Sequence, residues 1–158
     1  MSGQDILANS GVTGCLNKAG LGIGSTPAEL SIAAPNGAGV DYAIDGIAYH
    51  LADDATVVMT AMAVQAVSTS CLYLVELDSS GTLSTKKGNE ILTANLGVVG
   101  GTLQWPAPSA DKCPIGGFKV ATNASTTYTG ATTDLDAAGI TDTYYDFALG
   151  LPLAPQVS

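Results

Sequence analysis

The chain has 158 residues, of which 46% are hydrophobic and only 12% are charged, and its formal net charge is -9. This length suits one domain that buries roughly 70% of the surface of the unfolded chain. All five cationic residues are lysines, against 14 acidic residues. Without arginine the chain lacks the planar group that grips phosphates, and its acidic field repels nucleic acid and anionic lipid. We therefore expect neither nucleic acid nor a membrane as a partner.

Targeting and redox signals are weak throughout the sequence. The first ten residues lack the basic and apolar regions of a classical secretory signal. The most apolar run, residues 57–67, is shorter than the roughly 20 residues that a bilayer requires, and we expect buried strand there. The three cysteines, Cys15, Cys71 and Cys113, are widely spaced and odd in number. Such spacing favours free thiols and assembly in a cytosol over a disulfide framework or a zinc site.

The composition predicts an all-β fold. The chain holds 19 glycines and many serines and threonines, which is typical of short strands broken by turns. We expect an antiparallel β-sandwich or a jelly-roll-like barrel with an extended N-terminal arm, and the strand order stays open. The expected divisions are an arm over residues 1–24, a β-rich domain over residues 25–148 and a C-terminal tail over residues 149–158.

The arm has too few large apolar side chains to fold alone, so we expect it to be either loose or docked on another surface. Its scattered apolar residues favour docking; they are Ile6, Leu7, Val12, Leu16, Leu21 and Ile23. After the arm, residues 26–29 would suit the start of a short helix. The alternation of Leu30, Ile32 and Ala34 with smaller or polar residues favours a strand, which we prefer.

Two hairpins are predicted in the middle of the chain. In residues 40–51, Asp45-Gly46 suits a type I′ turn, which pairs Asp41 with His50 and puts the large apolar residues on one face. In residues 71–86, the turn over residues 78–81 pairs Leu77 with Leu83. Between the hairpins, residues 57–64 are apolar on both faces and predict a strand that is covered on both sides.

The second half of the chain gives a mixed pattern. Residues 89–103 favour one short helix, although three glycines weaken it. Residues 105–108 predict a rigid extended connector. A strand is expected over residues 115–121, in which Gly116-Gly117 indicates a bulge or a close backbone approach, and the last strand over residues 141–147.

No motif points to catalysis, and we expect no enzyme activity and no cofactor. His50 beside Asp41 resembles a general base, but no serine or cysteine in its neighbourhood carries a nucleophile signature. The glycine-rich stretch at residues 20–25 lacks the preceding strand and the lysine of a phosphate loop. Several aspartates gather near the C-terminal end, but without the spacing of a calcium loop, so we assign no metal site; they are Asp134, Asp136, Asp142 and Asp146.

Three stretches together resemble the small β-rich virion proteins of tailed bacteriophages. They are VQAVSTSCLYLV at residues 64–75, KCPIGGFKV at residues 112–120 and TDLDAAGITDTYYDF at residues 133–147. The similarity covers residues 25–147. The resemblance implies a head decoration (cement) protein, often a homotrimer, that binds the major capsid protein on the outer capsid surface of the virion after assembly in the host cytoplasm. It implies no active-site residue.

The leading hypothesis from the sequence is therefore a non-enzymatic protein that stabilises the phage head. We expect the arm to contact the capsid through Ile6, Leu7, Leu16, Leu21 and Ile23. Trp105 is expected at a subunit interface, which is the commoner use of a single tryptophan. The alternative is a receptor- or glycan-binding module of a phage fibre or tail, in which Trp105, Tyr128 and Tyr144 would stack on sugars. A hydrolase that uses Asp41 and His50 ranks last.

Overall fold

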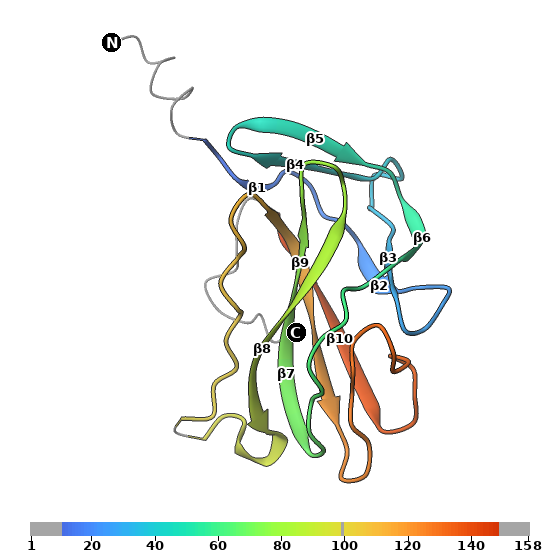
Figure 1. The fold of residues 1–158 in the computed structure, drawn as a ribbon, viewed down its shortest axis with the longest axis vertical. Helices are drawn as coiled ribbons and strands as arrows, with labels where there is room; N and C mark the ends of the chain where they lie inside the picture. Colours follow the sequence, from blue (N-terminus) through green and yellow to red (C-terminus); the bar gives the residue numbers. More distant parts are fainter. Residues whose placement is uncertain (1–10, 99, 149–158) are drawn as a thin grey trace.

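The computed structural model describes residues 11–98 and 100–148, and these residues form an all-β protein (Figure 1). Every strand pairing is antiparallel, which confirms the predicted fold class. The one helical element in this part of the chain is a 3-10 turn at Thr93–Asn95. The strands are β1 (Gly14–Cys15), β2 (Leu21–Ile23), β3 (Leu30–Ile32), β4 (Val40–Ile44), β5 (Ile47–Leu51), β6 (Asp54–Val57), β7 (Thr69–Leu77), β8 (Leu83–Leu92), β9 (Cys113–Thr122) and β10 (Ile140–Asp146).

The strands form three sheets that share one core. The largest, which we call the main sheet, has the order β10-β9-β7-β8, and two smaller sheets have the orders β1-β4-β5 and β2-β3-β6. Buried residues from all three sheets form a single hydrophobic cluster that includes Leu30, Tyr42, Tyr73 and Phe118. Tyr73 stacks on Phe118 with ring centroids 5.0 Å apart. This arrangement, with small sheets over one face of a larger sheet, is compatible with a β-sandwich.

The other face of the main sheet is covered by the extended segment 101–112. Leu72 and Leu74 in β7 are 0% exposed and alternate with the core-facing Tyr73. Trp105 lies over Gly117, where a Cβ atom would collide with its indole ring. The pairing of β7 with β9 shifts register beside Gly116. The close approach predicted as one alternative at Gly116-Gly117 is therefore confirmed, and the bulge lies next to this pair, with Ile115 as the extra residue.

Both predicted hairpins are confirmed residue by residue. β4 pairs with β5 so that Asp41 lies opposite His50, and Asp45 and Gly46 have φ values of 50° and 81°. β7 pairs with β8 so that Leu77 lies opposite Leu83. The apolar face of the first hairpin is buried on β4, whereas on β5 Tyr49 and Leu51 are partly buried against the core and Ile47 is 59% exposed.

The three shorter strand predictions are also confirmed. Leu30, Ile32 and Ala34 are at most 5% exposed and follow strand spacing through β3, so the strand is correct and the competing helix is not. β9 covers the expected residues 115–121, with Phe118 and Val120 completely buried. β10 begins one residue before the predicted last strand.

The buried strand predicted over residues 57–64 is wrong. β6 ends at Val57, and residues 58–64 run extended outside any sheet. Val58 is 65% exposed and Val64 is 56% exposed. β7 already has neighbours on both sides, and residues 58–64 form no backbone ladder with the edge strands β8 and β10. Side chains of β8 bond to them instead, as Thr85 Oγ1 does to Thr60 O at 3.1 Å.

The short helix predicted over residues 89–103 is also wrong. β8 continues to Leu92, which pairs with Thr69 at the beginning of β7. Only the 3-10 turn at Thr93–Asn95 follows, and Gly97 and Gly100 then adopt positive φ values of 80° and 87°. Sheet pairing therefore outweighs the helical spacing of the apolar residues in this segment.

The structure corrects the expected boundary of the arm at residue 24. Residues 14–15 and 21–23 form β1 and β2, and Cys15 and Ala19 are 0% exposed within the core cluster. The backbone N–H of Leu21 donates to Asp146 Oδ1 at 3.0 Å. The described part of the arm is thus docked on the chain's own domain. Residues 1–10 and the predicted tail over residues 149–158 lie outside the described residues.

Candidate functional site

The outer face of the β1-β4-β5 sheet is the most distinctive exposed surface near the beginning of the described chain. The backbone N–H of Leu16 donates to Asp41 O at 2.8 Å, so Leu16, Asp41 and His50 form one row across the three strands. Val12 lies at the other end of β1, where its carbonyl accepts a bond from Gly46 N at 3.0 Å. Val12 is 60% exposed and Leu16 is 45% exposed. We call Val12, Leu16, Asp41 and His50 the outer face.

The Asp41–His50 pair lies on this face, away from the buried serine and cysteine of β7. His50 Nδ1 and Asp41 Oδ1 are 2.8 Å apart, and both side chains are half exposed. The serine and cysteine next to each other in β7, Ser70 and Cys71, are buried in the main sheet, and Ser70 Oγ bonds to Thr93 Oγ1 at 3.0 Å. The described residues therefore do not assemble a nucleophile, base and orienting acid around His50.

The three cysteine thiols are unreactive at neutral pH. Each cysteine is free and 0% exposed. Burial raises the pKa of Cys15 and of Cys71 to about 11 and that of Cys113 to about 12. Because the thiolate is the reactive form, these cysteines are poor nucleophiles and poor metal ligands at pH 7.

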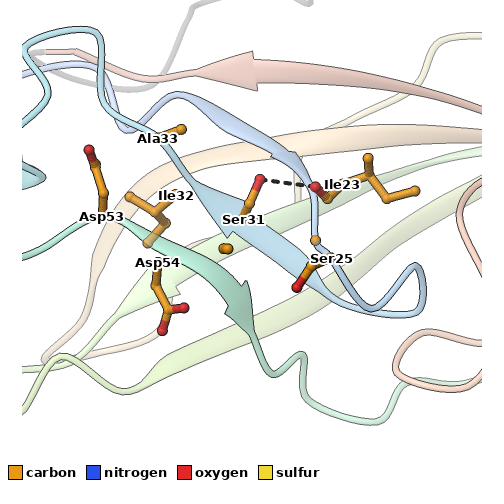
Figure 2. A pocket seen from close by; sticks show the side chains of 9 residues that line it. Ile23, Ser25, Ser31, Ile32, Ala33, Asp53 and Asp54 are labelled. Carbon is orange, nitrogen blue, oxygen red and sulfur yellow. Dashed lines mark hydrogen bonds between the residues drawn. The ribbon is translucent and has the colours of Figure 1, made fainter.

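A hollow of about 490 Å³ lies between β2, β3 and β6 (Figure 2). Its polar side chains already serve the fold. Asp53 Oδ1 accepts a bond from Ala34 N at 2.8 Å, Asp54 Oδ1 accepts one from Thr56 N at 2.9 Å, and Ser31 Oγ donates to Ile23 O at 3.0 Å. Each of these side chains thus has a role in holding the backbone around the hollow.

Metal ligation has no support among the described residues. Within residues 11–98 and 100–148, no three Asp, Glu, His or Cys side chains are placed to hold an ion. Asp146, one of the aspartates noted in the sequence, instead accepts the bond from Leu21 N.

The sequence-predicted contact residues are distributed over several surfaces. Leu16 belongs to the outer face, whereas Ile23 is 37% exposed in a different sheet and Leu21 is 8% exposed and packs against Gly116. Trp105 is half-buried, and its ring meets Tyr145 and Phe147 edge-on. Ile6 and Leu7 lie outside the described residues. Of the predicted arm contacts within the described residues, Leu16 and Ile23 are exposed enough to meet a partner.

The aromatic residues proposed for sugar stacking are mostly occupied within the protein. Tyr128 is 0% exposed and packs edge-on against Tyr73, with ring centroids 5.5 Å apart. Tyr144 is half-buried beside Phe118. Sugar binding needs exposed aromatic faces, so these residues offer little area for stacking.

Sequence reasoning missed the exposure of Val58, Val64 and Val67, which it placed in buried strand. The sequence carries no signal of this exposure, because a continuous apolar run is also what a buried strand shows.

No family model, curated protein or solved structure matches this chain. Among the residues that the structure describes, no helix combines the length and the apolar character of a membrane span.

Proposed function

We propose that this chain is a non-enzymatic virion structural protein that binds the major capsid protein on the outer surface of a phage head and stabilises the head. The proposal rests on the resemblance of residues 25–147 to phage virion proteins. The observation that carries it is the outer face, where Val12 and Leu16 are exposed close to the beginning of the described residues. Exposed apolar residues grouped on a rigid sheet are typical of a contact surface.

A contact surface that binds weakly is sufficient for a protein whose copies attach at more than one point on a repeating lattice. Val12 and Leu16 expose little apolar area, so one copy would bind weakly through this face alone. The apolar Ile6 and Leu7 in the adjoining segment provide a second attachment point. Linked contacts raise the effective concentration of the second binding event, and association of copies into a homotrimer multiplies the effect.

The proposed function predicts that the purified protein protects undecorated heads. Heads are incubated with the wild-type chain, and DNA release is followed while the temperature rises. We expect release to shift to a higher temperature, because bound copies must dissociate before neighbouring capsomers separate. Equal release with and without the protein would refute the proposal.

Variants of the same protein test whether the outer face is the surface that contacts the head. We expect Val12→Asp combined with Leu16→Asp to abolish both binding to heads and protection, because the substitutions place charge in an apolar contact. Val98→Asp is the matched control, since Val98 is also 60% exposed but lies in the turn after β8. Equal loss of binding in the control would show that the outer face is not the contact.

Receptor or glycan binding on a fibre or tail remains the alternative proposal. It would use Trp105, Tyr128 and Tyr144, of which Tyr128 is completely buried. No contact in the described chain favours this function over head stabilisation. Binding of the purified protein to host cells or to a glycan array, with no binding to heads, would favour it.

A further inference from the structure

The most apolar stretch of the chain lies on the surface. We call residues 58–67 the apolar strip, and Figure 1 shows it running from β6 to the beginning of β7. Val58, Val64 and Val67 are 65%, 56% and 38% exposed. Leu92, 53% exposed, extends the surface, because it pairs with Thr69 two residues beyond the strip. A soluble protein rarely leaves such a surface uncovered.

The backbone of the strip is also open to a partner. None of the N–H groups of residues 59–64 donates to another described residue. Two carbonyls accept side-chain bonds, Thr60 O from Thr85 Oγ1 at 3.1 Å and Val64 O from Lys87 Nζ at 2.7 Å. An extended segment with free N–H groups can accept another strand along its edge.

The strip is held firmly at both ends. Met59 is 3% exposed and belongs to the core cluster. Gln65 is 0% exposed, and its backbone N–H donates to Tyr128 O at 2.7 Å. The strip is therefore a preformed surface, and binding of a partner would cost little of the conformational entropy that is lost when a loose segment becomes ordered.

The charge distribution indicates which partner fits. Residues 55–75 contain no charged side chain, although the whole chain carries a net charge of -9. Lys87 and Glu90, which bond to Val64 O and Ala66 N at the edge of the strip, form an ion pair and neutralise each other. Two copies of an acidic protein repel each other over most of their surfaces, and this repulsion is smallest where both surfaces are neutral.

We propose that the apolar strip is the surface through which one copy of this chain binds a second copy. Val58, Val64 and Val67 are buried against the second copy, and alternate free N–H groups of residues 59–64, those on one edge of the extended segment, bond to its backbone. The inference rests on the proposed function in one respect, since it names the contact that would join the subunits of a decoration oligomer. Its test needs no heads, so the two proposals can fail separately.

The test is the mass of the full chain in solution. Sedimentation velocity is measured on wild-type protein from about 1 to 100 μM, a range that detects micromolar dissociation constants. We expect a species whose mass is a multiple of 15.8 kDa. Val58→Glu combined with Val64→Glu should raise the dissociation constant at least about tenfold. Ile47→Glu, at a residue outside the strip that is 59% exposed, should leave it unchanged.

Hydrogen exchange provides a second measurement that does not depend on a variant. We expect the amides of residues 59–64 to exchange more slowly as the wild-type concentration rises, because a second copy covers them. A wild-type chain that stays monomeric up to the highest concentration overturns the proposal. So does an unchanged mass in the Val58→Glu, Val64→Glu variant, or dissociation by Ile47→Glu alone. Protection of these amides in a monomer would assign the strip to another segment of the same chain and would also overturn it.

Discussion

Replacement of Gln65 by leucine is expected to lower the free energy of unfolding by about 3 kcal/mol. The Gln65 side chain is completely buried. Its Nε2 donates to Thr69 O and Val120 O, each at 3.1 Å, and its Oε1 accepts a bond from the Tyr73 hydroxyl at 2.8 Å. Leucine has a similar volume but leaves the Tyr73 hydroxyl without that partner inside the core, and this orphaned group makes the largest contribution to the loss.

Urea unfolding followed by tryptophan fluorescence measures this loss. Gln104→Leu is the matched control, because Gln104 is exposed and its side chain makes no hydrogen bond to a described residue; its stability should change by less than about 0.5 kcal/mol. The double variant Gln65→Leu with Tyr73→Phe should recover part of the stability, since it removes both partners together. A single variant as stable as the wild type would contradict the role assigned to Gln65.

Raising the pH from 9 to 11 is expected to unfold the protein. An unperturbed thiol has a pKa of 9.0, whereas burial raises the pKa values of Cys15, Cys71 and Cys113 to about 11, 11 and 12. In this window the folded chain keeps thiol protons that the unfolded chain loses, so stability is complete below pH 9 and falls as the pH rises. Each thiol contributes a slope of up to about 1.4 kcal/mol per pH unit.

The slopes of three thiols add to several kcal/mol over two pH units, a large part of the stability of a typical domain. Tyr73, Tyr128 and Tyr144 act in the same direction above pH 10, because burial raises their pKa values as well. Urea unfolding at pH 7, 9, 10 and 10.5 measures how the free energy of unfolding falls with pH. In Cys113→Ala this free energy should fall less steeply. A free energy of unfolding that stays constant from pH 8 to 10.5 would contradict the assignment.

The elements that sequence reasoning predicted correctly are those whose signals are local. Asp45-Gly46 and Gly81 fix the geometry of two turns, and each turn fixes the register of the strands beside it. Residues 58–64 could not be placed in the same way. Their composition suits a buried strand, and whether such a run joins a sheet depends on contacts between residues far apart in sequence, which composition does not show.

The candidate site was less predictable than the fold. The exposure of Leu16 agrees with its predicted role as a contact residue, but Leu21, of similar character, packs within the core. The difference depends on Gly116 and Asp146, which contact Leu21 although they come much later in the sequence, Asp146 by 125 positions. Apolar residues scattered in a sparse segment do not reveal which of them face inward, because the segment has no periodicity of its own.

The bond between Leu21 N and Asp146 Oδ1 joins residues 125 positions apart and therefore links the fold to the order of synthesis. β9 separates β7 from β10 in the main sheet, so β10 is added last and brings Asp146 to β2. A ribosome-bound chain that has not yet reached residue 140 lacks this strand. Closure of such long-range pairings is slow, and incomplete sheets expose unpaired edges. The contact between β2 and β10 thus forms late, only after the final strand has emerged, whereas β1 and β2 can pair with β4 and β3 earlier.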